Sequence, residues 1–140
     1  MCRSALPQRN SMADRPLKKL RVFVLEDEVL VAMLLEDMLR DIGCVVAGLA
    51  ITVDEGLAHV ASVEADIAVL DVNVGGAESF AIAEGFAARG IPIVFSTGYA
   101  EADLPERWRD WPRMAKPYTV ADLAAALTVA LDGPPAHQPA

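Results

Sequence analysis

Two absences in the sequence limit where the protein can work: it has few cysteines and no long apolar run. Only two of the 140 residues are cysteines. Cys2 lies near the N-terminus and Cys44 within an apolar run, so neither a disulfide framework nor a metal-ligand spacing is present. No segment approaches the roughly 18 to 20 apolar residues of a membrane span, and the N-terminus lacks the apolar stretch of a signal peptide. We therefore expect a soluble, unexported protein of the reducing cytoplasm.

Basic residues are also scarce. The chain has 12 Lys and Arg against 20 Asp and Glu, which gives a net charge of −8. A polyanionic partner such as DNA or a phosphoinositide surface would be repelled without a local basic patch, and Lys18, Lys19 and Arg21 are too few to form one. We expect no nucleic-acid partner and no membrane partner.

What the sequence does contain is enough apolar material for one domain. Apolar residues make up 54% of the chain, sufficient to bury a core without disulfides or metals. The N-terminal residues combine Pro, Ser, Asn and Arg without any period, and three prolines fall within the last eight positions. We expect disordered tails over 1–18 and 132–140 and one folded domain over 19–131.

Short apolar runs alternate with amphipathic stretches of helix length, the pattern of repeated βα units. The runs are nearly continuous in Val, Ile, Leu and Ala, which is typical of strands covered by helices on both faces. Right-handed crossovers favour a doubly wound sheet, for which 2-1-3-4-5 is a common order. We expect an α/β fold with a five-stranded parallel sheet in this order, a flavodoxin-like three-layer sandwich. The predicted strands are 20–25, 44–50, 66–72, 91–96 and 113–115.

Start and stop signals mark the helices. In 28–42, Leu30, Leu34 and Met38 recur every four residues, and Gly43 can close the helix. A further helix is predicted over 77–89. The second and last helices are expected to open with capping boxes, formed by Thr52 with Glu55 and by Thr119 with Asp122. In 98–112, by contrast, Gly and Pro interrupt a poorly spaced apolar pattern, which predicts at most a short helix.

Carboxylates gather at the ends of two predicted strands. Glu26, Asp27 and Glu28 directly follow the first strand, and Asp71 lies at the end of the third. In a 2-1-3-4-5 sheet the ligand crevice lies outside the carboxyl ends of these strands, so the acids should face each other. Converging carboxylates raise each other's pKa unless a hard cation neutralises them, and Mg²⁺ prefers oxygen ligands. We expect a magnesium site with Asp27 and Asp71 as direct ligands. Glu26 would act through water, and the backbone carbonyl of Asn73 would complete the protein's share.

A hydroxyl and an ammonium group join these acids at the same edge of the sheet. The fourth predicted strand ends in Ser96 and Thr97, and Lys116 follows the fifth. A carboxylate, a divalent cation, a hydroxyl and a lysine together suit attack by an aspartyl oxygen on a phosphoryl group. We expect Asp71 to be the nucleophile.

With these residues in place, residues 19–131 resemble the receiver domain of two-component response regulators, the CheY-like fold. The resemblance rests on Glu26-Asp27, on Asp71 within "LDVN", on Thr97 and on Lys116-Pro117, in the family's order. It implies that Asp71 accepts a phosphoryl group from a histidine kinase or histidine phosphotransfer protein in a Mg²⁺-dependent phosphorelay. It also implies that Thr97 and Lys116 contact the phosphoryl oxygens. Such a domain is a phosphoacceptor that catalyses only its own phosphorylation and dephosphorylation, so we do not expect an enzyme.

Within that family, "FSTGY" resembles the subgroup whose signature is Phe-Ala-Thr-Gly followed by an aromatic, with Ser96 in place of the alanine. Typical receivers carry a switch aromatic three positions before the lysine, where this chain has Arg113. Because the subgroup generally lacks that aromatic, Arg113 fits it, and Tyr99 or Tyr118 could contribute an aromatic from elsewhere.

The chain ends soon after the last predicted helix, so we expect a stand-alone receiver, a monomer or weak dimer. Its output would then be binding to a downstream protein, or the draining of phosphoryl groups from a relay.

Each of these features also has a simpler interpretation. Acids at a helix start often only complement the helix macrodipole. Asp71 could be a turn residue, Thr97 a helix N-cap and Lys116 a solvated surface residue. Their combination favours a functional site over these separate explanations.

Three other protein classes share part of the pattern. A haloacid-dehalogenase-type phosphatase requires a second acid two positions after its nucleophile, where this chain has Asn73. A flavodoxin-like cofactor binder needs a phosphate loop after the first strand, where acids would repel phosphate. The open alternative is a pseudo-receiver, a binding module with this fold that works without phosphorylation.

Overall fold

The central feature of the fold is a five-stranded parallel sheet. The computed structural model of the chain describes residues 17–98 and 104–133. Its sheet has the order β3-β2-β4-β7-β8, with every neighbouring pair parallel. Counted along the chain this order is 2-1-3-4-5, which confirms the predicted fold class. The strands are β2 (Arg21–Leu25), β3 (Val45–Ala50), β4 (Ile67–Asp71), β7 (Ile93–Thr97) and β8 (Arg113–Ala115).

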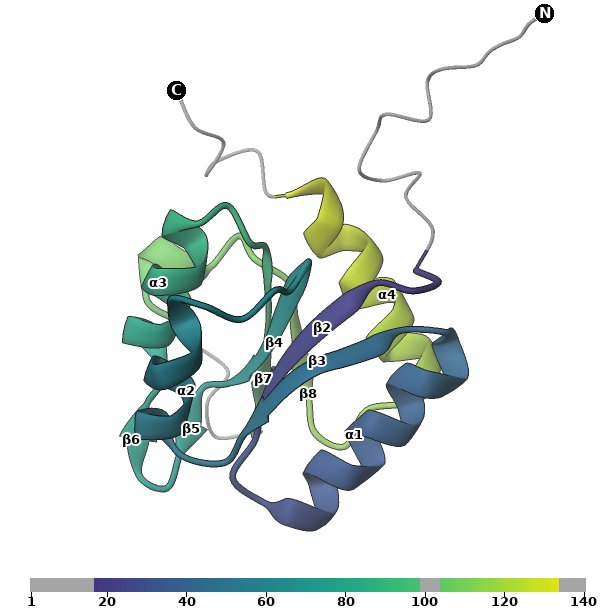
Figure 1. Cartoon of the computed structure of the whole chain (residues 1–140), viewed down its shortest axis with the longest axis horizontal. Helices are drawn as coiled ribbons and strands as arrows, with labels where there is room; N and C mark the ends of the chain where they lie inside the picture. The colour runs from purple at the N-terminus through teal and green to yellow at the C-terminus, as the bar shows by residue number, and fades with distance from the viewer. Residues whose placement is uncertain (1–16, 99–103, 134–140) are drawn as a thin grey trace, which may run out of the picture.

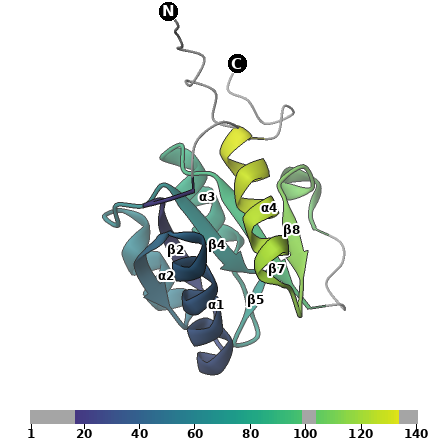
Figure 2. The same ribbon diagram turned by 90° about the vertical axis from the view of Figure 1, so that its right-hand side faces the viewer.

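Helices cover both faces of this sheet. Helices α2 (Val53–Val60) and α3 (Phe80–Ala88) lie on one face, and α1 (Val29–Ile42) and α4 (Val120–Asp132) lie on the other (Figure 1; Figure 2 shows the same layers after a quarter turn). The two helices on each face also contact each other, α2 with α3 and α1 with α4. Among the described residues, no helix has the length and apolar character needed to cross a membrane.

The sheet separates two apolar cores. Alternate residues of β2 point to opposite faces, so Phe23 packs with the α2–α3 layer and Val24 with the α1–α4 layer. All five residues of β4 and of β7 are buried. Burial on both sides explains why these strands are nearly continuous apolar runs in the sequence.

Helix α1 carries more apolar residues than it buries. Its buried stripe is Ala32, Leu35 and Leu39. Leu30 is 80% exposed and Leu34 is 54% exposed, so part of the four-residue repeat that predicts this helix lies on its solvent side. Gly43 ends the helix as expected: at φ 100° its N–H donates to carbonyls of the last turn.

The third helix begins later than predicted. We expect it over 77–89, but it spans Phe80–Ala88, because Ala77 and Glu78 form the strand β6 (Ala77–Glu78) and pair with β5 (Asn73–Val74). Within the described part of the stretch 98–112, the 3₁₀ turn η4 (Glu106–Trp108) agrees with the prediction of at most a short helix. Tyr99 lies outside the described residues.

The capping signals are confirmed to different degrees. At α4 the Thr119 hydroxyl accepts from the Asp122 N–H at 3.1 Å, and the Asp122 carboxylate accepts from the Thr119 N–H at 2.9 Å, a complete capping box. At α2 the Thr52 hydroxyl accepts from Glu55 N–H, but the Glu55 carboxylate accepts from the N–H of Ile51. The second box is therefore displaced by one residue.

Close contact between α2 and α3 gives a test of the packing. A Cβ atom added at Gly85 would overlap Cγ1 of Val60, a β-branched side chain that has little room to rotate. We expect Gly85→Ala to lower the free energy of unfolding by about 1–3 kcal/mol, measured by urea denaturation. The double variant with Val60→Ala should be less destabilised than the sum of the single variants. A Gly85→Ala protein as stable as wild type would contradict the packing described.

Candidate functional site

The acids that follow two adjacent strands meet at one edge of the sheet. Glu26 and Asp27 come directly after β2, and Asp71 is the last residue of β4, the strand that pairs with β2. One carboxylate oxygen from each of the three residues lies within 4.8 Å of the others. Glu26 is 1% and Asp71 4% exposed. The structure thus brings together the carboxylates that the sequence places at the switch point of the sheet.

Lys116 reaches two of these acids. Its Nζ lies 2.8 Å from Oε1 of Glu26 and 3.1 Å from Oδ2 of Asp71. The backbone also fixes its position, because the Lys116 N–H donates to the carbonyl of Thr97 at 2.9 Å, at the end of the β7–β8 pair. In this way a lysine that follows the edge strand β8 lies next to the last residue of the central strand β4.

Backbone groups hold the acids in place. The Asp27 carboxylate accepts from the N–H of Gly75 at 2.9 Å, and the second oxygen of Glu26 accepts from the N–H of Glu28 at 3.1 Å. The buried Ser79 hydroxyl donates to the Asp71 carbonyl at 2.6 Å. Each contact restricts the movement of a residue that carries one of the charged side chains.

Sequence reasoning missed two of these contributors, Gly75 and Ser79. Ser79 is the N-cap residue of α3, and a serine before an apolar helical stretch is a recognisable helix start. The bond from Ser79 to Asp71, however, depends on the β5–β6 hairpin between them, which the sequence analysis did not foresee.

The remaining candidates lie at the same edge. Thr97 is buried, and its hydroxyl donates to the carbonyl of Met114 at 3.5 Å. Asn73 opens β5 two residues after Asp71, and its side-chain oxygen accepts from the N–H of Gly76 at 3.1 Å. The roles predicted for these two residues, phosphoryl contact and metal coordination, stay predictions.

The electrostatics of the site show an excess of negative charge. Burial, with the nearby charge of Glu26, raises the pKa of Asp71 from 3.8 to about 7, although Lys116 opposes the shift. Burial also disfavours the charged form of Lys116, but its contacts with Glu26 and Asp71 dominate and raise the lysine pKa above its usual value. One ammonium group therefore shares a pocket with three carboxylates, a donor set that suits a hard divalent cation.

Response regulator receivers are among the solved structures similar to this chain. SdrG from Sphingomonas melonis Fr1 is 42% identical with a TM-score of 0.72, and the match covers 80% of this chain and 95% of SdrG. The BeF3-activated conformation of SdrG from Pseudomonas melonis Fr1 is 40% identical with a TM-score of 0.69, covering 82% of this chain and 98% of that one. The PhyR response regulator REC domain of Erythrobacter litoralis is 25% identical with a TM-score of 0.71, covering 89% and 97%.

Sequence comparison agrees with the structures. The transcriptional regulatory protein PdtaR of Mycobacterium tuberculosis is 34% identical over 115 residues, or 79% of this chain and 56% of PdtaR. The chain thus spans about half the length of the curated relatives that it matches. No model of a known family matches the chain. The chain belongs to the receiver domain family of response regulators.

The raised pKa of Asp71 predicts a pH-dependent stability. Between the unfolded pKa of 3.8 and the folded pKa of about 7, the folded state binds more protons, so this group makes stability fall as pH rises. Without divalent cations, Asp71→Asn should therefore stabilise the protein more at pH 8 than at pH 5, with a difference of about 1–3 kcal/mol after solvent screening. Urea unfolding at both pH values measures it.

Asp132→Asn is the matched control, because it removes an exposed carboxylate at the far end of α4. Its effect should not change between the two pH values. An equal effect of Asp71→Asn at pH 5 and pH 8 would show that Asp71 is not held at a raised pKa.

Proposed function

We propose that this chain is a phosphoacceptor: Asp71 takes a phosphoryl group from a histidine kinase or histidine phosphotransfer protein in a Mg²⁺-dependent phosphorelay. The observation that carries the proposal is the position of the Asp71 carboxylate. It lies at the carboxyl end of the central strand, 3.1 Å from the Lys116 ammonium and beside Glu26 and Asp27. The membership of the receiver family and the BeF3-activated state of the relative SdrG support the same conclusion.

The donor set supports magnesium as the cofactor. Three converging carboxylates and one ammonium leave a net negative charge that a divalent cation would neutralise. Asp27 and Asp71 would hold the ion, Glu26 would act through water, and the carbonyl of Asn73 would add a neutral oxygen. When bound, Mg²⁺ would supply positive charge to the carboxylates and to the oxygens of the transferred group.

In the transfer, an Asp71 carboxylate oxygen attacks the phosphorus of the donor phosphohistidine. The new O–P bond forms as the P–N bond breaks, the electron pair of that bond returns to the imidazole nitrogen, and that nitrogen takes a proton from solvent water. The negative charge on the equatorial phosphoryl oxygens requires cationic and hydrogen-bonding support. Lys116 supplies the first and the Thr97 hydroxyl, at the same sheet edge, supplies the second.

Exposed apolar side chains beside this site favour a protein donor. On α1, Leu30 is 80%, Met33 55% and Leu34 54% exposed. A groove of about 320 Å³ runs from this helix to the segment after β8, and its lining includes Leu34, Lys116 and Tyr118. Because Lys116 belongs both to the groove and to the acceptor site, a protein seated on α1 would have its reactive group next to Asp71. We propose this face for docking of the donor, in the cytoplasm as the sequence leads us to expect.

Acetyl phosphate tests the proposal without a cognate kinase. Incubated with acetyl phosphate and Mg²⁺, the wild-type protein should gain the mass of one phosphoryl group, read by intact mass spectrometry. Asp71→Asn should gain none, because the attacking oxygen is lost. Asp27→Asn should lose most of the Mg²⁺-dependent labelling, because a direct ligand is removed, while Asp132→Asn should label as wild type.

If the Asp71→Asn variant is still labelled, the phosphoryl acceptor is a residue other than Asp71. A folded wild-type protein that acquires no phosphoryl group from acetyl phosphate with Mg²⁺ would favour the pseudo-receiver instead.

A further inference from the structure

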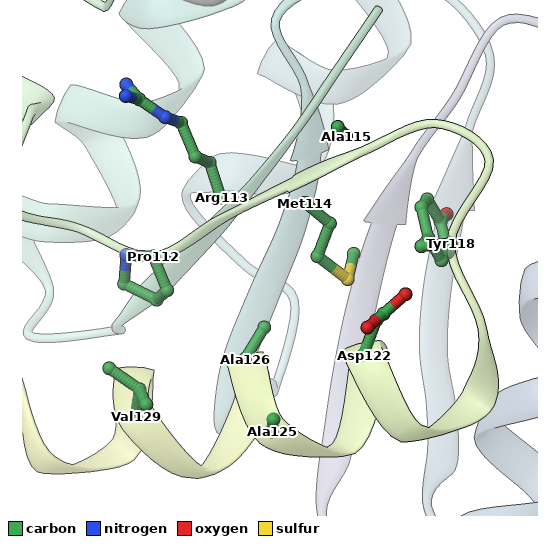
Figure 3. A pocket seen from close by; sticks show the side chains of 9 residues that line it. All are labelled: Pro112, Arg113, Met114, Ala115, Tyr118, Asp122, Ala125, Ala126 and Val129. Atoms are coloured by element: carbon green, nitrogen blue, oxygen red, sulfur yellow. The ribbon is translucent and has the colours of Figure 1, made fainter.

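Tyr118 lines two surface grooves, one of which also contains Lys116 of the acceptor site. It lines the groove beside α1 that also contains Lys116, and it lines a second groove of about 490 Å³ between β8 and α4. Figure 3 shows Tyr118 and Asp122 at one end of the second groove, with Pro112 and Val129 toward the other. A movement of the Tyr118 ring would therefore reshape the walls of both grooves.

The hydroxyl group of Tyr118 is buried and has no hydrogen-bond partner among the described residues, and the same is true of the hydroxyl of Ser96, which is 2% exposed. An unsatisfied buried hydroxyl costs about 1–3 kcal/mol. Burial raises the pKa of Tyr118, with the charge of Glu26 adding to the effect, whereas the hydroxyl of Ser96 lowers it in part. The hydroxyls of Ser96 and Tyr118 are thus near neighbours, and each is left without a hydrogen bond that the other could supply.

Strand register places Ser96 directly beside the acceptor residue. Ser96 pairs with Asp71 on β4 and with Met114 on β8, and paired residues of parallel strands point to the same face of the sheet. Met114 belongs to the core under α1 and α4, and Tyr118 packs against that core. Asp71, Ser96 and Tyr118 therefore lie on one side of the sheet.

The chemistry of a serine hydroxyl suits a relay between these neighbours. Its single proton can rotate toward either partner, while its lone pairs accept from the other. Added negative charge at Asp71 would attract that proton and leave the Ser96 oxygen free to accept from the phenol. Successive hydrogen bonds in a buried chain polarise and strengthen one another.

We propose that Ser96 and Tyr118 form a hydroxyl pair that transmits a change of charge at Asp71 to the groove between β8 and α4. This inference rests on the proposed function, because phosphorylation of Asp71 is the change of charge. Ser96 is a positioning residue that acts on the groove through Tyr118. Arg113, an exposed residue of β8, lines the same groove, so β8 contributes no aromatic side chain to its wall.

A tyrosine-specific NMR signal tests the relay. The full chain, labelled with ¹³Cζ-tyrosine, gives two resonances, for Tyr99 and Tyr118, which the variant Tyr118→Phe assigns. Beryllofluoride with Mg²⁺ serves as the phosphoryl mimic, and ¹⁹F NMR reports whether it is bound. In wild type the Tyr118 resonance should move on binding. In Ser96→Ala at least half of that movement should be lost, although the ¹⁹F signal of the bound mimic remains.

Ser62→Ala is the matched control, because it removes an exposed hydroxyl in the turn after α2, and its Tyr118 resonance should move as in wild type. If Ser96→Ala fails to fold, Ser96→Cys, whose thiol is a weak donor, replaces it with the same expectation.

The outcomes separate this inference from the proposed function. If no bound ¹⁹F signal forms with wild type, the acceptor site itself is wrong. If the mimic binds while Tyr118 stays unmoved, or moves equally in Ser96→Ala, the acceptor site stands and the relay is wrong.

Discussion

One ammonium group shared by three carboxylates is the constraint on which the rest of this structure depends. Lys116 lies within 3.1 Å of both Glu26 and Asp71, and Asp27 contributes the third converging oxygen. Burial disfavours the charged form of Asp71 and the nearby charge of Glu26 adds to this effect, so the pKa of Asp71 rises to about 7. A site in this state would gain stability from a bound cation, and this is the condition under which the proposed phosphoryl transfer would work.

The fold makes such a site possible because each charged group follows a different strand of a rigid sheet. Glu26 and Asp27 follow β2, Asp71 ends β4 and Lys116 follows β8. The cores on the two faces of the sheet supply the stability that offsets the repulsion at its edge. Side chains and backbone N–H groups from the neighbouring loops then fix the acids. The apolar interior thus determines where the charges lie, and the charges determine what the site can bind.

Much of this arrangement could be predicted from the sequence, for physical reasons. Strands buried on both faces leave continuous apolar runs, and parallel topology places the ends of β2 and β4 side by side, so the meeting of Asp27 with Asp71 follows from strand order alone. The contacts of Gly75 and Ser79 with the acids did not follow, because they depend on a hairpin with only two residues in each strand. Nor could periodicity show which apolar stripe of α1 faces the solvent, since both stripes have helical spacing.

The relation of Ser96 to Tyr118 was beyond sequence reasoning for a similar reason. The sequence offers Tyr118 only as one of two aromatics that could replace the residue missing at Arg113. Strand register places Ser96, the residue at which this chain departs from the Phe-Ala-Thr-Gly signature, beside Asp71 on the face of the sheet against which Tyr118 packs. A departure from a motif can thus add a polar group that the motif itself does not contain.

A ¹³C NMR titration of the Asp71 carboxyl carbon would test the charge imbalance most directly. Without divalent cations, the carboxyl group should titrate near pH 7 instead of near its ordinary value of 3.8, and adding Mg²⁺ should move the titration well below 7 because the cation favours the charged form. Titration near the ordinary value in the absence of cations, or a midpoint that Mg²⁺ leaves unchanged, would contradict the electrostatic origin proposed for this site.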